Sequence, residues 1–431
     1  MRVLVLGGYG LIGSEVVRRL RADGLEVIGF GRSAAKGKQF APDIDWVGAD
    51  LATLVSPERW APHLRGVDAV VNASGALQNG AKDKLGASQD EAIVALIAAC
   101  AGSGTRRYVQ ISAPGAAVNA KTAFMRTKAK ADAALRASAL EWTILKPGLV
   151  VSAYAYGGTA LLRMLAAFPV AQPLMLPDAR LQTVAAADVA ETVAVALTTD
   201  RLVRHELSLV ERPIHTLAET VSAFRAWLGF RQSNMTLVIP RFVGAVVGYC
   251  ADLAGWLGWR SPLRTTALEV LTGNVLGDSD QGEAALGRPL KTLAQSLDAL
   301  PATMQERIFA RAQLVFPALA LSLAAFWIAS GIVAITHANA AVRVLNHTPF
   351  EQSAMTWVVA GAILDVIIGI GVCVRATSRP AAWSAVVVSI AYIALGSWAT
   401  PQLWVDPLGP FMKIIPVIAL ALAVAALAQE R

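Results

Sequence analysis

The chain has 431 residues, of which 55% are hydrophobic, and its mean hydropathy of +0.51 is too high for an ordinary soluble protein. The apolar residues gather after about residue 314, so the composition separates a soluble front part from a membrane-embedded back part. The net charge of +7 comes from scattered Lys and Arg without an aromatic-rich basic stripe, which excludes nucleic acid as the expected partner and favours anionic membrane lipid.

The chain opens with a short strand and a glycine-rich turn. Residues 2–6 are β-branched and leucine residues, and glycines at GxxGxxG spacing follow before helical periodicity over residues 14–21. Such a turn lets the backbone approach a pyrophosphate, whose charge the N-terminus of the helix stabilises. We therefore predict a dinucleotide site here, the alternative being a plain βα turn. The predicted binding residues of this turn are Gly7, Gly10, Leu11, Ile12 and Gly13.

A second strand, predicted at residues 26–30, leads into a basic segment with Arg32, Lys36 and Lys38. A carboxylate at this position would bind the ribose 2′-hydroxyl of NAD, whereas a guanidinium suits the 2′-phosphate of NADP. The segment predicts that NADP(H) is preferred and leaves NAD(H) as the alternative cofactor. A solvated basic loop would have the same composition.

Further strands alternate with helices along the front half. Strands are predicted at residues 45–51, 67–71, 108–112 and 142–145, with a helix at 89–103 that buries Cys100. This alternation predicts an α/β fold with a doubly wound, mostly parallel sheet. Such sheets bind ligands at the carboxyl ends of their strands, where Gly75 is expected.

These segments resemble the atypical or extended short-chain dehydrogenase/reductase superfamily, in its NmrA-like and complex I 39-kDa-subunit-like branches, over about residues 1–215. The resemblance rests on the glycine turn, Arg32, Asp50-Leu51, Asn72 to Gly75, Ser112, Pro147-Gly148 and residues 181–190. It implies a Rossmann domain in which Arg32 holds the 2′-phosphate, Asp50 and Leu51 the adenine, and Lys128 the nicotinamide ribose. The remaining cofactor-binding residues that it implies are Ala73, Ser74, Gly75 and Pro147.

The catalytic pattern of that superfamily is incomplete here. Its active members carry a Tyr four residues before a Lys, and a Ser on the fifth strand completes the set. The resemblance implies catalytic roles for Lys128 and Ser112, but Phe124 stands where the Tyr should be, and phenylalanine cannot transfer a proton. Either another group substitutes, or the domain binds the nucleotide without the usual reaction. The tyrosines that qualify by position are Tyr108, Tyr154 and Tyr156.

The middle of the chain divides less clearly. Residues 1–233 are expected to form the Rossmann domain with a small substrate-side subdomain, in which Asp188 is expected to cap a helix rather than to act in catalysis. Residues 234–311 are expected to form a linker with an interfacial helix at 237–259, the alternative being a buried helix of the soluble domain. The histidines are isolated and the cysteines form no CxxC pair, so no metal site is expected.

Residues 312–431 are predicted to be an all-α membrane domain with four spans, at about 314–335, 354–374, 382–398 and 411–428. With the segment 326–331 (FWIASG), this unit resembles the DoxX-like family, which is linked to quinone-coupled redox chemistry. The distribution of Arg and Lys in the connections predicts a multi-pass protein of the cell inner membrane whose N-terminal domain is cytoplasmic. Asp365 is the one acid deep inside a span, which marks it as functional or paired.

The leading interpretation is a membrane-anchored NADP(H)-dependent oxidoreductase acting on a lipophilic substrate such as a quinone or a lipid carbonyl. A homodimer or a membrane redox partner is compatible with the four spans. The alternative is a non-catalytic NAD(P)H-binding sensor or an assembly factor for a membrane complex, which Phe124 favours. A transporter regulated by the soluble domain is a third interpretation, for which Asp365 is the only hint.

Overall fold

The computed structural model describes residues 1–75, 85–232, 235–259 and 261–428. The chain forms two compact units. The first contains Met1–Leu253 and Ser261–Ala310, and the second contains Ala254–Arg260 and Arg311–Arg431. The predicted boundary between residues 233 and 234 lies outside the described residues. Most of the segment suggested as a linker, residues 261–310, belongs to the first unit.

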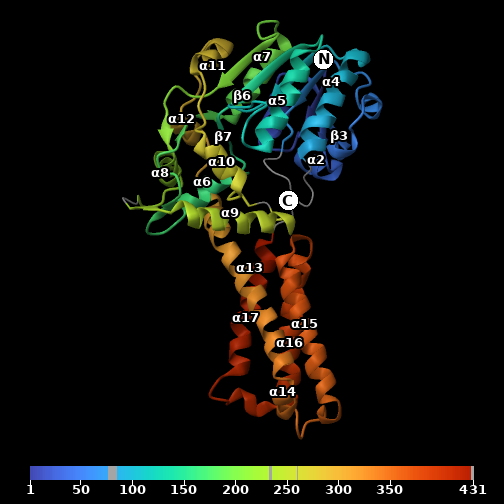
Figure 1. Ribbon diagram of the computed structural model, residues 1–431, viewed down its shortest axis with the longest axis vertical. Coiled ribbons are helices and arrows are strands. Elements are labelled where there is room, and N and C mark those ends of the chain that lie inside the picture. Colours follow the sequence, from blue (N-terminus) through green and yellow to red (C-terminus); the bar gives the residue numbers. More distant parts are fainter. Residues whose placement is uncertain (76–84, 233–234, 260, 429–431) are drawn as a thin grey trace. The chain divides into compact units, whose positions relative to one another are not determined.

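The first unit is built on a parallel sheet of seven strands in the order β11-β6-β5-β4-β1-β2-β3 (Figure 1). The order reverses beside β1, between β1 and β4, which makes the carboxyl end of this pair the switch point of a doubly wound fold. The predicted fold class is thereby confirmed, although β11 was not foreseen. The strands are β1 (Arg2–Leu6), β2 (Glu26–Gly31), β3 (Asp45–Gly48), β4 (Ala69–Asn72), β5 (Arg107–Ile111), β6 (Glu141–Pro147) and β11 (His205–Leu209).

Helices cover both faces of this sheet, because successive residues of each strand point to opposite faces. Val3 and Val5 of β1 join one apolar cluster, which includes α1 (Gly13–Ala22) and α7 (Ala186–Thr198). Leu4 and Leu6 join the other, with α4 (Ala92–Ser103) and α5 (Ala123–Arg136). Cys100 is fully buried in this second cluster, as predicted.

Three two-stranded ladders and several short helices complete the first unit. The ladders pair β7 (Leu149–Val151) with β10 (Thr183–Ala185), β8 (Gln172–Leu174) with β13 (Thr236–Val238), and β9 (Arg180–Leu181) with β12 (His215–Thr216). The helices are α2 (Ala34–Phe40), α3 (Pro57–Trp60), α6 (Gly158–Ala166), α8 (Leu217–Trp227), α9 (Arg241–Trp256), α10 (Thr265–Thr272), α11 (Ser279–Leu286) and α12 (Leu293–Asp298).

The segment after α10 is tied to the sheet through buried carboxylates. Glu211, which follows β11, accepts a 2.7 Å hydrogen bond from the backbone N–H of Leu293 in α12. Asp188 is fully buried, forms an ion pair with Arg288 at 2.8 Å and accepts from the backbone N–H of Lys291. The prediction that Asp188 caps α7 is therefore wrong: Ala185 is the N-cap residue, and the Asp188 carboxylate binds the 288–291 segment instead.

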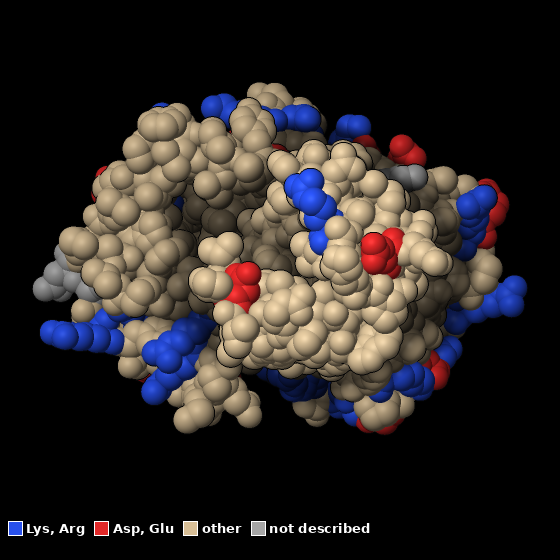
Figure 2. All heavy atoms as spheres, turned by 90° about the horizontal axis from the view of Figure 1, so that it is seen from below, with Lys and Arg blue, Asp and Glu red and all other residues tan. Residues whose placement is uncertain are grey.

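The second unit is helical and contains four helices that are long and apolar enough to cross a membrane, which confirms the predicted all-α membrane domain. Its interior is mostly apolar, with Leu323, Trp327, Ile368 and Ala421 among the buried residues, and it also contains the buried Asp365. In the view from below, most of the visible face consists of side chains other than Lys, Arg, Asp and Glu (Figure 2). The helices are α13 (Met304–Thr336), α14 (Ala338–Val344), α15 (Ala354–Cys373), α16 (Arg375–Ala399) and α17 (Pro410–Leu427).

Candidate functional site

The glycine turn after β1 has no room for a side chain at Gly7 or at Gly13. Gly7 has a positive φ of 70°, and its amide donates to the Phe30 carbonyl at 2.9 Å. A Cβ on Gly13 would lie 2.1 Å from the Gly7 carbonyl oxygen, and one on Gly7 would lie 2.9 Å from the Ala73 carbonyl oxygen. No side chain caps the N-terminus of α1 at Ile12. The turn thus presents bare backbone and an uncapped helix end, which fits a bound pyrophosphate.

The carboxyl end of β4 forms the neighbouring wall of this site. Asn72 is buried and accepts hydrogen bonds from both the backbone N–H and the hydroxyl of Ser74, while its amide donates to Gln110 at 2.9 Å. These bonds fix residues 73–75 beside the glycine turn, since the Ala73 amide donates to the Leu6 carbonyl. The predicted cofactor-binding residues of β1 and β4 therefore lie together.

Lys128 reaches this edge of the sheet from α5. Its side chain is 5% exposed, and its ammonium donates to the carbonyls of Ile111 at 2.8 Å and Ser74 at 3.1 Å. Burial lowers the pKa of Lys128 to about 8. An ammonium has three N–H bonds, and the third has no acceptor among the described residues, so it can serve a ligand at this edge.

Asp132 is a site residue that the sequence reasoning missed. It lies one turn after Lys128 on α5, is 1% exposed, and accepts a 2.5 Å hydrogen bond from the Ser112 hydroxyl. Burial is the main reason why the pKa of Asp132 is raised, and the Ser112 bond opposes that shift. In the sequence, Lys128 and Asp132 look like an exposed i,i+4 ion pair on a helix surface. The one signal for a buried Asp132 is the small and apolar residues beside it on α5.

Phe124 lies one turn before Lys128 and is half-buried, so residues 124, 128 and 132 share one side of α5. Among the candidate tyrosines, Tyr108 is fully buried near the start of β5, its side chain lies near Asn72 and Asp132, and burial is the main reason why its pKa is raised well above the usual value. Tyr154 is partly exposed, and its hydroxyl accepts from Arg18 at 3.1 Å.

The segment after β2 contacts the glycine turn. The backbone N–H of Ser33 donates to the Tyr9 hydroxyl at 3.2 Å, which places Arg32 at the end of β2 beside that turn. Arg32 is exposed. Lys38 does not contribute to this basic cluster, because its ammonium donates to the carbonyls of Pro42 and Ile44.

The remaining predicted residues lie at the carboxyl ends of β3 and β6. Asp50 is exposed and uses its carboxylate to cap the short 3₁₀ turn Leu51–Thr53 by accepting from Ala52 N–H at 3.1 Å. Leu51 packs against the second apolar cluster. Pro147 is the last residue of β6 and is buried.

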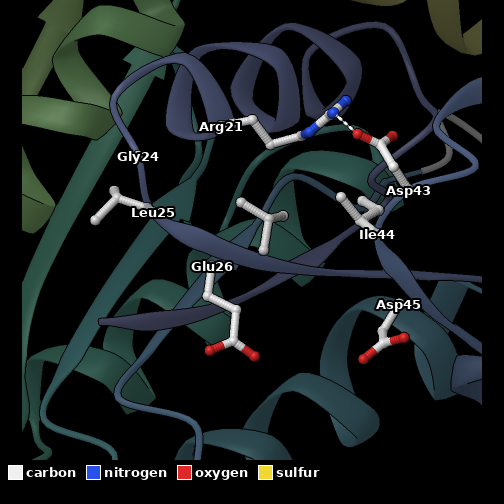
Figure 3. A pocket seen from close by; sticks show the side chains of 8 residues that line it. Arg21, Gly24, Leu25, Glu26, Asp43, Ile44 and Asp45 are labelled. Atoms are coloured by element: carbon white, nitrogen blue, oxygen red, sulfur yellow. Dashed lines mark hydrogen bonds and ion pairs between the residues drawn. The ribbon is translucent and has the colours of Figure 1, made fainter.

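A depression of about 450 Å³ lies elsewhere, at the amino ends of β2 and β3 (Figure 3). Arg21 and Asp43 form an ion pair across it, and Glu26 and Asp45 are partners of Arg2. Because parallel sheets bind nucleotides at their carboxyl ends, this depression is not the cofactor site. No group of His, Cys, Asp and Glu that could hold a metal ion occurs in the part of the chain that the structure describes.

Comparison with known proteins agrees with this geometry. Residues 7–200 match the NAD(P)H-binding family model, and residues 324–422 match the DoxX-like family. The first unit therefore contains an NAD(P)H-binding family domain with a Rossmann-like fold. The chain as a whole combines this domain with a DoxX-like membrane domain, as the sequence resemblance predicted.

Two curated relatives each match about a third of the chain. The photosystem II assembly factor Ycf39 of Synechocystis is 34% identical over 151 residues, which cover 34% of this chain and 44% of that protein. The NAD(P)H azoreductase of Xenophilus azovorans is 30% identical over 147 residues, covering 34% and 47%. The chain thus spans less than half the length of each of these relatives.

A solved structure resembles the first unit in fold. The NADPH-dependent quinone oxidoreductase QOR2 of Escherichia coli, in complex with NADPH, has a TM-score of 0.55 and 18% identity, covering 69% of this chain and 98% of its own. At this identity the likeness concerns the fold alone.

Proposed function

We propose that the protein is a membrane-anchored NADP(H)-dependent reductase that acts on a lipophilic substrate such as a quinone or a lipid carbonyl. The observation that carries this proposal is the buried Lys128 beside the glycine turn, in a chain that also has four membrane-length helices. A soluble substrate would not require the membrane helices, whereas a substrate dissolved in the bilayer would.

In this proposal the residues at the carboxyl edge hold NADPH. The glycine turn (Gly7, Gly10, Leu11, Ile12 and Gly13) binds the pyrophosphate, and Arg32 binds the 2′-phosphate that distinguishes NADPH from NADH. Asp50 and Leu51 contact the adenine, while Ala73, Ser74, Gly75, Lys128 and Pro147 surround the nicotinamide ribose. NADPH, when bound, supplies a hydride.

Lys128 is the best-placed proton donor among the described residues. A carbonyl that gains a hydride at carbon also needs a proton at oxygen, and Phe124 cannot provide it. One N–H bond of the ammonium has no acceptor among the described residues, and its pKa of about 8 allows it to release a proton near neutral pH. The Ser112 hydroxyl donates to the buried Asp132 carboxyl in the structure, so it can donate to the substrate oxygen only when Asp132 is protonated and donates to Ser112 in its place.

We place the protein in the cell inner membrane, with the Rossmann domain cytoplasmic, α9 at the membrane surface and residues 312–431 across the membrane. The helix α9 supports a surface role, because Phe242, Val246, Tyr249 and Leu253 are 59–72% exposed on it. Such a row suits the boundary between headgroups and acyl chains. Membrane lipid is therefore a partner, and a homodimer or a redox partner would complete the membrane unit.

A second candidate function is a non-catalytic NAD(P)H sensor or an assembly factor for a membrane complex. Phe124 favours this function, since the usual phenol is absent while the ribose-binding Lys128 is kept. The assembly factor among the relatives is compatible with it.

One experiment separates the two functions. The full-length protein in lipid nanodiscs would be incubated with NADPH deuterated at C4 of the nicotinamide and with a panel of quinones and lipid carbonyls. We expect deuterium in a reduced product by mass spectrometry, and loss of that transfer in Lys128→Met. NADPH binding without transfer to any substrate would support the sensor, and failure to bind either nucleotide would reject both functions.

A further inference from the structure

Three helices of the membrane unit bring polar side chains to one point in its interior. Asp365 lies mid-way along α15 and is only 5% exposed. Its Oδ2 accepts a 2.8 Å hydrogen bond from the Ser330 hydroxyl of α13, and its Oδ1 accepts a 2.9 Å hydrogen bond from the Tyr392 hydroxyl of α16. Both carboxyl oxygens are thus held by neutral donors.

No cation accompanies this carboxyl among the described residues. Ser330 faces it from α13 and Tyr392 from α16, and Tyr392 is the one titratable group in contact with it. An isolated charge in a membrane interior is costly, so a carboxyl in such surroundings is stabilised by taking up a proton. The charged side chains of α13, α16 and α17 lie near the starts of those helices, at Glu306, Arg307, Arg311, Arg375, Arg379 and Lys413. Helix α14, which also contacts α15, carries Arg343 in its last turn.

The hydrogen bonds around Asp365 can accommodate either protonation state. The Tyr392 hydroxyl also lies 3.4 Å from the carbonyl oxygen of Gly361, one turn before Asp365 on α15. When the carboxyl is ionised, the phenol donates to Oδ1. When Oδ1 carries a proton, the carboxyl donates to the phenol oxygen, and the phenol donates to the Gly361 carbonyl instead.

Gly361 makes this second arrangement accessible. A Cβ at this position would lie 3.1 Å from the Tyr392 hydroxyl oxygen, tighter than an ordinary contact, so any larger residue would crowd the phenol. The missing side chain keeps the carbonyl within reach of Tyr392. A rotation of one hydroxyl group therefore suffices to change between the two states.

We propose that Asp365 is a proton-binding site inside the membrane unit, and that Tyr392 and the Gly361 carbonyl form the hydrogen-bond switch that lets it load and release that proton. The proton comes from water and returns to it, and no bond other than the O–H bond of the carboxyl changes. The site does not depend on the nucleotide-binding function of the first unit.

The test is an infrared titration of the full-length protein in lipid nanodiscs, without nucleotide. A protonated carboxyl has a C=O stretching band that a carboxylate lacks. We expect a band that disappears as the pH rises, is absent in Asp365→Asn, and persists in Asp406→Asn, which removes a half-buried carboxyl elsewhere in the same unit. No band that depends on Asp365 at any pH would overturn the proposal, and so would a band that the pH does not change.

A second variant keeps the proposal testable if Asp365→Asn fails to fold. Tyr392→Phe removes a hydrogen bond that favours the ionised carboxyl, so the pH at which the band is half lost should rise by about one to two units. Trp404→Phe, in the same unit but away from Asp365, should leave that midpoint unchanged. An unchanged midpoint in Tyr392→Phe would show that the phenol is not part of the switch.

Discussion

The Ser112 hydroxyl donates a 2.5 Å hydrogen bond to Asp132, and the two side chains are 5% and 1% exposed. The other carboxyl oxygen of Asp132 has no hydrogen-bond partner among the described residues. A buried carboxyl with one unsatisfied oxygen is costly in its ionised form. The protonation state of Asp132 therefore depends on its burial and on its neighbours Ser112 and Lys128.

Asp132→Asn should stabilise the first unit at neutral pH. The folded pKa of Asp132 is raised, so its contribution to stability is greatest below its ordinary pKa and is lost as the pH rises through the folded value. The advantage of the variant should therefore shrink as the solution becomes more acidic. Thermal unfolding followed by tryptophan fluorescence at several pH values measures this, with the exposed Asp298→Asn as control. An equal loss of stability at every pH would contradict the prediction.

NADPH affinity should fall as the pH rises through about 8. Burial lowers the pKa of Lys128 to about that value, and above it the side chain is a neutral amine that binds ribose hydroxyls and phosphates more weakly. Lys128→Met should bind roughly tenfold to a hundredfold more weakly and lose this pH dependence. Fluorescence titration measures both, and Lys130→Met, an exposed lysine paired with Asp90, is the matched control. An unchanged pH profile in Lys128→Met would assign the dependence to another group.

Arg32→Ala should weaken NADPH binding by about tenfold to a hundredfold and leave NADH binding nearly unchanged, because only NADPH carries the 2′-phosphate. Lys38→Ala is the control, since the Lys38 ammonium is already bonded to two backbone carbonyls. Calorimetric titration with both nucleotides provides the comparison. Equal losses for the two nucleotides would mean that Arg32 supports the fold of the site rather than reading the phosphate.

Gly13→Ala should abolish nucleotide binding and destabilise the first unit by about 1–3 kcal/mol. The added Cβ would lie 2.1 Å from the Gly7 carbonyl oxygen, so the turn must open. Gly102→Ala in α4, where nothing lies within 4 Å of the new Cβ, should be harmless. Circular dichroism melts and NADPH titration of the two variants test the contrast. Retained binding in Gly13→Ala would be incompatible with a pyrophosphate at this turn.

Phe124→Tyr should raise the rate of hydride transfer if the protein is a reductase. The new phenol would lie one turn from Lys128 on α5, where it can supply a proton. Phe124→Leu, which changes the packing without adding an acid, should not raise the rate. Single-turnover oxidation of NADPH with a quinone acceptor measures the gain. If no variant transfers a hydride while all of them bind NADPH, the sensor function is the better account.

The sequence predicts most of the sheet and the nucleotide edge, because both depend on local signals. The glycine turn, Lys128 and the strands on either side of them are local patterns with few alternatives. β11 was missed because His205 to Leu209 is only five residues long and mostly polar, and its strand character comes from pairing with β6. Asp132 was missed, and Asp188 was wrongly predicted to cap a helix, for a related reason. Their burial depends on partners in distant segments, such as Arg288, which lies 100 residues from Asp188.

The all-parallel arrangement of the main sheet also affects how the chain folds. Parallel neighbours cannot be joined by tight hairpins, so every pairing must wait for an intervening crossover to be made. β11, which forms one edge of the sheet, is the last of the seven strands along the chain, and it precedes α13. During synthesis the sheet can therefore be completed from the amino-terminal side before the first apolar helix emerges. Slow steps in sheet assembly would then precede membrane insertion rather than compete with it.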